Sequence, residues 1–249
     1  MRKIAYGLVS LLLAMSAACG GGGGSGGDGS LVALANTIQR HTSASYIPLT
    51  SWSGSLEDSD VVGVGTIVDV RAGMTFVQGK YDDGTDILDP RMLLVIEPTR
   101  LVEGAELLGA SGQILVQQNR SSAVPLDDVA RTIDGAQDQI AFFLREMIVP
   151  IEMGDAIRDE FAGRASDDPV FTPVYASALL GVQGTTAFPL LTGEELVLTD
   201  DARQVLGSLG VEIDGFAVVK LGTPPALAGS TPDKPPVPPD DGSALAPAE

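Results

Sequence analysis

Two reactive side chains are almost missing from this sequence of 249 residues, which contains one cysteine, Cys19, and one histidine, His41. A single cysteine excludes an intramolecular disulfide framework. A single histidine leaves a Ser-His-Asp triad or a histidine-rich zinc site unsupported. No Gly-x-Ser-x-Gly turn follows a predicted strand, and no Walker-type phosphate loop is present. The sequence therefore predicts no catalytic, cofactor-binding or metal-binding residue, and His41 is interpreted as a surface side chain.

Positive charge is also scarce. The chain has 15 basic residues against 33 acidic ones, a formal net charge of -18 at pH 7. Phosphate backbones and anionic lipid headgroups repel such a surface, which argues against nucleic-acid binding and against a polybasic membrane patch. Hydrophobic residues make up 44% of the chain and charged residues only 19%. This balance is typical of a packed core rather than of a disordered chain.

An apolar run long enough to span a membrane is missing at the N-terminus. Arg2 and Lys3 precede an apolar run at residues 4–14, and small residues follow at 16–18. A positive start, a short apolar core and a small-residue exit are typical of a secretory signal peptide. The run is shorter than the roughly 20 residues of a membrane helix. We therefore predict a signal peptide at residues 1–18 and an exported protein.

Residues 15–20, Met-Ser-Ala-Ala-Cys-Gly, resemble the lipobox of bacterial lipoproteins. The resemblance implies that the Cys19 thiol carries a diacylglyceryl group and becomes the first residue after cleavage, so that acyl chains such as palmitate hold the protein at the cell membrane or envelope. Leucine is commonest three places before the cysteine in this family, and Ser16 stands there. Ser16 and Ala18 also fit ordinary signal peptidase cleavage, which would release the same chain without lipid. The lack of a partner for Cys19 favours lipidation, because a free thiol is a liability in an oxidising compartment.

The segment after Cys19 consists almost entirely of glycine and serine, and we define residues 19–30 as the lipidated cysteine and its tether. A flexible glycine-rich linker of eleven residues spans about 17–20 Å. At ~0.8 kcal/mol per buried CH₂, two acyl chains suffice for stable anchoring. The sequence thus predicts a globular body that is tethered to the membrane and free to reorient.

Residues 31–222 are expected to form a single β-rich domain. Residues 61–70 are β-branched and punctuated by glycine, which predicts a central strand, and residues 73–79 are expected to be its hairpin return. A turn is expected at residues 181–184. Further strands are predicted at residues 92–97, 113–117, 140–145, 174–180, 185–191 and 211–221.

A few short helices are predicted around these strands. The clearest begins after Thr199, where an N-cap residue precedes Asp200 and Asp201, and ends at Gly210. The other predicted helices lie at residues 31–40, 126–133 and 153–161.

Short strands without regular βαβ alternation favour a mainly β fold, either a small antiparallel sheet or an OB-like barrel, with a few short peripheral helices and disordered termini. Residues 59–67, 140–145 and 181–184 together resemble a recurring kind of uncharacterised exported bacterial protein, over roughly residues 60–198. This resemblance implies no activity. Residues 223–249 contain eight prolines, which predicts a disordered tail that either solubilises the protein or docks a partner.

The acidic run Asp82-Asp83-Gly84-Thr85-Asp86, followed by Asp89, is the stretch closest in character to a Ca²⁺ site. It lacks the residue order of an EF-hand loop, and we interpret it as a solvated hairpin loop. Four carboxylate pairs, at residues 127–128, 167–168, 194–195 and 200–201, are interpreted as turn and cap residues rather than acid/base pairs.

Two functions from different classes remain open. The first is a membrane-tethered binding or structural module of the cell envelope, with the membrane, through Cys19, and an envelope protein as its partners. The second is an envelope hydrolase that uses paired carboxylates or a calcium-binding acidic loop. The anchor, the tether and the lack of catalytic patterns favour the first.

Overall fold

The computed structural model describes residues 30–41, 49, 51–120, 124–134, 136, 138–148, 157–175 and 177–219. Cys19, most of the tether and the proline-rich tail lie outside these residues. The described chain is mainly β, as predicted, with a large mixed sheet and a few short helices. In chain order the elements are α1 (Leu31–His41), α2 (Trp52–Glu57), β1 (Val61–Lys80), β2 (Asp86–Glu103), η1 (Ala105–Leu107), β3 (Ile114–Asn119), α3 (Leu126–Ile133), β4 (Gln139–Glu146), β5 (Ile157–Arg158), β6 (Val170–Pro173), β7 (Leu179–Gln183), β8 (Thr186–Pro189), α4 (Asp200–Ser208) and β9 (Gly215–Phe216).

Five of the strands close into a barrel. β1 pairs with β2, β2 with β3, β3 with β6, β6 with β4, and β4 pairs back with β1. With α3 between β3 and β4 in the chain, this is the arrangement of an OB-like barrel. The sheet is mixed rather than purely antiparallel, because β3 pairs with β6, and β8 with β9, in parallel. A parallel pair needs a long crossover connection, and α3 and β4 lie within the connection from β3 to β6.

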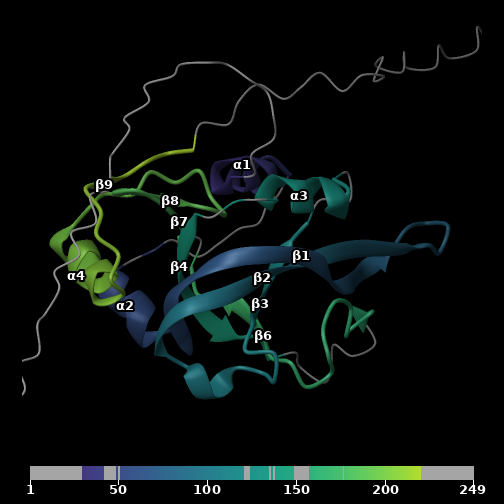
Figure 1. The fold of residues 1–249 in the computed structure, drawn as a ribbon. Helices are drawn as coiled ribbons and strands as arrows, with labels where there is room; N and C mark the ends of the chain where they lie inside the picture. Colours follow the sequence, from purple (N-terminus) through teal and green to yellow (C-terminus); the bar gives the residue numbers. More distant parts are fainter. Residues whose placement is uncertain are drawn as a thin grey trace, which may run out of the picture.

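β1 and β2 form a hairpin that extends beyond the barrel as a two-stranded arm (Figure 1). The predicted return at residues 73–79 is wrong, since these residues continue β1. A β-carbon on Gly73 would lie 3.1 Å from the Met92 carbonyl carbon, so this glycine serves close strand approach rather than a turn. The chain reverses at residues 81–85 instead, where Gly84 adopts a φ of 84°.

Residues 92–96 of β2 and 140–144 of β4 are buried on both faces, which explains their unbroken apolar sequences. In β4, Phe142 belongs to the barrel interior, whereas Phe143 packs on the opposite face of the strand. The same alternation holds in β2, whose inner residues are Met92, Leu94 and Ile96 and whose outer residues are Leu93 and Val95. Each of these two strands therefore contributes one row of side chains to the barrel core and another row to the packing outside the barrel.

Helices cover the barrel in two places. α1 and α3 lie side by side and contribute to the interior cluster (Figure 1). α2 and α4 pack together over the outer face of β4, where the Trp52 ring stacks on Phe216 at 5.5 Å and meets Phe143 edge-on at 6.0 Å. None of the helices in the described part of the chain is long and apolar enough to cross a membrane.

The structure tests the predicted helices and the later strands. The helices at residues 31–40 and 126–133 are confirmed, and α4 begins with the predicted cap, the Thr199 hydroxyl accepting a hydrogen bond from the Ala202 N–H. The predicted helix at residues 153–161 is wrong in its described part, since Ile157 and Arg158 form β5. The predicted last strand shrinks to β9, and residues 181–183 belong to β7 rather than to a turn.

Candidate functional site

The structure does not describe the side chains of the two residues that the sequence analysis singled out, Cys19 and His41. The proposed lipid attachment residue, Cys19, lies outside the described residues. His41 is the last residue of α1, and nothing is described of its side chain. Within the ranges that the structure describes, no group of three or more His, Cys, Asp or Glu residues could hold a metal ion.

The acidic hairpin loop is a turn in which Asp83 and Asp86 already have partners. Asp86 lies 3.2 Å from the Lys80 ammonium and also pairs with Arg158. The hydrogen bond from Lys80 is the main cause that lowers the pKa of Asp86, and the charges of Lys80 and Arg158 add to it. The Thr85 backbone N–H likewise lowers the pKa of Asp83. Each of these interactions satisfies a carboxylate within the hairpin, as expected for a solvated turn.

The predicted carboxylate pairs also have structural partners. Asp201 accepts hydrogen bonds from the backbone N–H groups of Trp52 and Ser53, at 2.8 and 3.3 Å, and so joins the start of α2 to α4. Glu194 accepts a hydrogen bond from the buried Ser177 hydroxyl at 3.1 Å. In the other two carboxylate pairs, Asp128 forms an ion pair with Arg131, and the Asp168 carboxylate accepts a hydrogen bond from the Ala165 N–H. These contacts agree with the interpretation as turn and cap residues.

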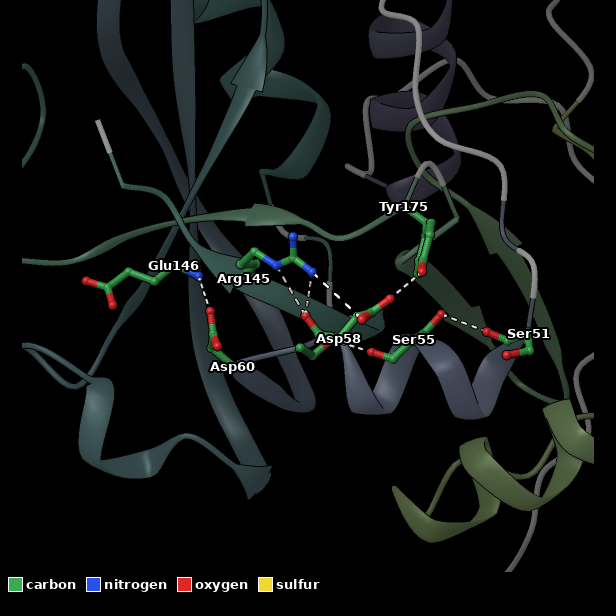
Figure 2. Close-up of polar contacts among 8 residues, drawn as sticks. Ser51, Ser55, Asp58, Asp60, Arg145, Glu146 and Tyr175 are labelled. Atoms are coloured by element: carbon green, nitrogen blue, oxygen red, sulfur yellow. Dashed lines mark hydrogen bonds and ion pairs between the residues drawn. The ribbon is translucent and has the colours of Figure 1, made fainter. Parts of the chain in front are cut away.

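A further polar cluster, which the sequence did not indicate, surrounds the end of α2 (Figure 2). The Arg145 guanidinium donates to the Asp58 carbonyl at 3.1 and 3.3 Å, and the Tyr175 hydroxyl donates to the Asp58 carboxylate at 2.5 Å. Two residues further along, Asp60 accepts from the Glu146 N–H at 2.8 Å. The side chains of Asp58 and Arg145 are 48% and 55% exposed, so their ion pair contributes little stability. The cluster fixes the junction of α2 and β1 against β4.

The outer face of β2 and β3, where OB-folds commonly bind their ligands, is closed in this protein. Leu93, Val95 and Leu115 on this face are at most 2% exposed. Met147 and Ile157, from the connection between β4 and β6, pack against them. The protein's own chain therefore covers this face of the sheet.

An open groove of about 470 Å³ lies on another side of the barrel, between β1 and α3. We call it the β1–α3 groove. Its volume falls within the range of protein ligand sites, about 300–1,000 Å³. The residues that line it are Thr66, Ile67, Val68, Asp69, Ala130, Arg131, Ile133, Asp134 and Ala136.

The floor and the rim of the β1–α3 groove differ in character. Ile67 and Ile133 are buried members of the barrel core, which makes the floor apolar. At the rim, Asp69 pairs with Arg71 at 2.8 Å, and Arg131 pairs with Asp128 outside the groove. Asp134 makes no hydrogen bond or ion pair with any other residue that the structure describes. The groove thus combines an apolar floor with the Asp134 carboxylate, which no residue in the described ranges pairs.

A second groove, of about 380 Å³, lies between α2 and α4 and contains Trp52, Glu194, Glu195 and Asp201 in its lining. The carboxylates of Glu194 and Asp201 are held there as hydrogen-bond acceptors for the protein itself. Three carboxylates, those of Glu194, Glu195 and Asp201, thus line this groove.

No protein-family model and no curated protein matches this chain. Sequence reasoning did not find the β1–α3 groove, because its two walls are far apart in the sequence. The sequence also gave no sign of the bulge in β1, because Val68 and Val70 keep an apolar period of two, although Ile67 and Val70 are the residues that enter the core.

Proposed function

We propose that this protein is a lipid-anchored lipoprotein of the bacterial cell envelope whose barrel acts as a binding module, with the β1–α3 groove as its binding surface. The observation that carries the proposal is the position of Ser30. This residue ends the predicted tether, and its backbone N–H donates to the Thr132 carbonyl at 2.8 Å. The last residue of the predicted tether is therefore held against α3 of the folded body.

The tether places the β1–α3 groove close to the proposed anchor. A chain of eleven residues extends at most about 40 Å, so Ser30 stays within that distance of Cys19. Thr132, which holds Ser30, lies between Arg131 and Ile133 in the lining of the groove. The groove is thus near the end of the barrel from which the tether leaves.

Charge favours a protein as the partner over a lipid surface or a nucleic acid. Without Arg2 and Lys3 of the proposed signal peptide, the chain has 33 acidic and 13 basic residues, a net charge of -20. Such a charge repels phosphate groups and attracts basic protein surfaces. An envelope protein is the partner that fits this charge and the proposed location.

The anchor can be tested by labelling growing cells with a fatty-acid analogue and isolating the protein. We expect the wild type to carry the label and the Cys19→Ala variant to carry none, because the thiol is the attachment point. Crosslinking in cells then compares the same two proteins, and partners of a tethered module should be lost from the variant. An unlabelled wild type would contradict the proposal.

The second candidate is an envelope hydrolase, and the convergence of Glu194 and Asp201 on the α2–α4 groove is the observation that favours it. A hydrolase of this kind should lose activity in Glu194→Gln or Asp201→Asn. A binding module should bind its partner equally well in both variants. A calcium-dependent rise in melting temperature, abolished by Asp82→Ala with Asp83→Ala, would support the acidic loop as the site instead.

A further inference from the structure

The wall of the β1–α3 groove contributed by β1 is an unpaired strand edge. β1 pairs with β4 from Val61 to Gly65 and with β5 at Thr75 and Phe76, whereas no other described strand pairs with this edge between them. Further along, Gly163 packs against the Ala72 carbonyl, so the chain itself covers that part. Residues 66–69 remain open toward the groove.

A β-bulge at Val68 shapes this open edge. Ile67 pairs with Ile96 and Asp69 with Val95, so Val68 has no residue opposite it on β2. The bulge lets Ile67 and Val70 both enter the barrel core and leaves the Val68 side chain 43% exposed. Bulges occur at sheet edges and beside functional sites, where they redirect a side chain.

One backbone N–H beside the bulge is already engaged by a side chain. The Val70 N–H donates to the side chain of its neighbour, Asp69, at 2.8 Å. A strand of four residues extends about 13 Å, which is enough for a short run of main-chain hydrogen bonds with an added peptide. An extended peptide is the ligand that satisfies such an edge while covering an apolar floor.

The charges of the rim select the kind of peptide. The pairs Asp69–Arg71 and Arg131–Asp128 are each neutral overall, so Asp134 gives the described rim its net negative charge. The net charge of -18 steers basic partners toward the protein and repels acidic ones. We propose that the β1–α3 groove binds an extended, basic segment of an envelope protein, which adds to β1 as a further strand at residues 66–69. This inference rests on the proposed function, since the tether is what would bring such a partner within reach.

The experiment uses the full-length protein and a fluorescent synthetic octapeptide that alternates valine with lysine. Fluorescence anisotropy measures binding, and hydrogen exchange followed by mass spectrometry locates it. We expect slower exchange at residues 66–69. A peptide with two central valines replaced by proline should bind about tenfold more weakly or worse, because it cannot donate the main-chain hydrogen bonds. A peptide with glutamate in place of lysine should not bind.

A matched pair of protein variants tests the rim. Asp134→Asn should weaken binding of the lysine peptide by up to about fivefold, the range of one exposed ion pair. Asp127→Asn removes the same charge from the first turn of α3, outside the groove lining, and should leave binding unchanged. Equal binding of the proline peptide, or no protection at residues 66–69, would overturn the inference.

Two further outcomes separate this inference from its alternatives. If the protein alone forms a dimer with protection at residues 66–69, the occupant is a second copy of the chain and the assignment to a partner is wrong. If the peptide binds as expected but the wild type carries no lipid, the proposed function fails and the strand-edge site stands. If the wild type is lipidated but residues 66–69 show no protection, the proposed lipid anchor stands and the strand-edge site is wrong.

Discussion

Gly63 lies where the barrel closes, and replacing it with alanine should measurably destabilise the protein. This residue pairs with Leu101 of β2 on one side and with Phe142 of β4 on the other. A β-carbon built on Gly63 would lie 2.4 Å from the Arg100 carbonyl oxygen and 3.0 Å from both the Leu101 side chain and the Phe142 ring. The oxygen belongs to a backbone held in the sheet, so it cannot move aside without distorting the barrel.

Overpacking of this kind costs about 1–3 kcal/mol. For a protein of about this size, each kcal/mol shifts the melting temperature by roughly 2–4 °C, so Gly63→Ala should melt about 2–12 °C lower. Gly207→Ala is the matched control. Gly207 lies within α4 and its β-carbon would meet no atom within 4 Å. Alanine there should stabilise the helix by about 0.5–1 kcal/mol.

Both variants can be compared with the wild type by urea unfolding, with thermal unfolding as a second probe. The expected result is a change of opposite sign for the same chemical substitution. If Gly63→Ala is as stable as Gly207→Ala, the three strands are not in the close contact described above, and the account of barrel closure through β1 and β4 is wrong.

Two further predictions concern a helix cap and an ion pair. Thr199→Ala should lower the free energy of unfolding by about 1 kcal/mol, because the Ala202 N–H loses its acceptor, whereas Thr199→Ser keeps the hydroxyl and should match the wild type. The pKa of Asp86 lies below its usual value of 3.8 in the folded protein, so its contribution to stability is present above that value and is lost as the pH falls through the lower, folded pKa. Asp86→Asn should therefore lose less stability than the wild type on acidification in that range, measured by urea unfolding across pH, while Asp82→Asn, which removes a loop charge without a described ion pair, should follow the wild-type curve. An identical acid response of Asp86→Asn and the wild type would show that the contacts with Lys80 and Arg158 do not act on folding.

Local patterns determined much of the fold. The apolar runs of β2 and β4 predicted buried strands, because strands covered on both faces carry apolar residues at consecutive positions. Thr199 and Gly210 marked the limits of α4, since capping depends on residues within one helical turn. Each of these signals is local, and the structure confirms them.

Contacts between distant segments decided the rest. Residues 73–79 were expected to be a hairpin return and instead continue β1, where Gly73 packs closely against Met92 and Arg91 on the neighbouring strand. The parallel pairing of β3 with β6 joins residues more than fifty positions apart. The β1–α3 groove likewise exists because β4 leaves the edge of β1 after Gly65 while α3 returns to lie beside it. The composition and N-terminal pattern of this sequence by themselves indicate export, anchoring and a β-rich body, whereas only tertiary packing decides which strand edge stays open, since strand period carries no information about which strands become neighbours.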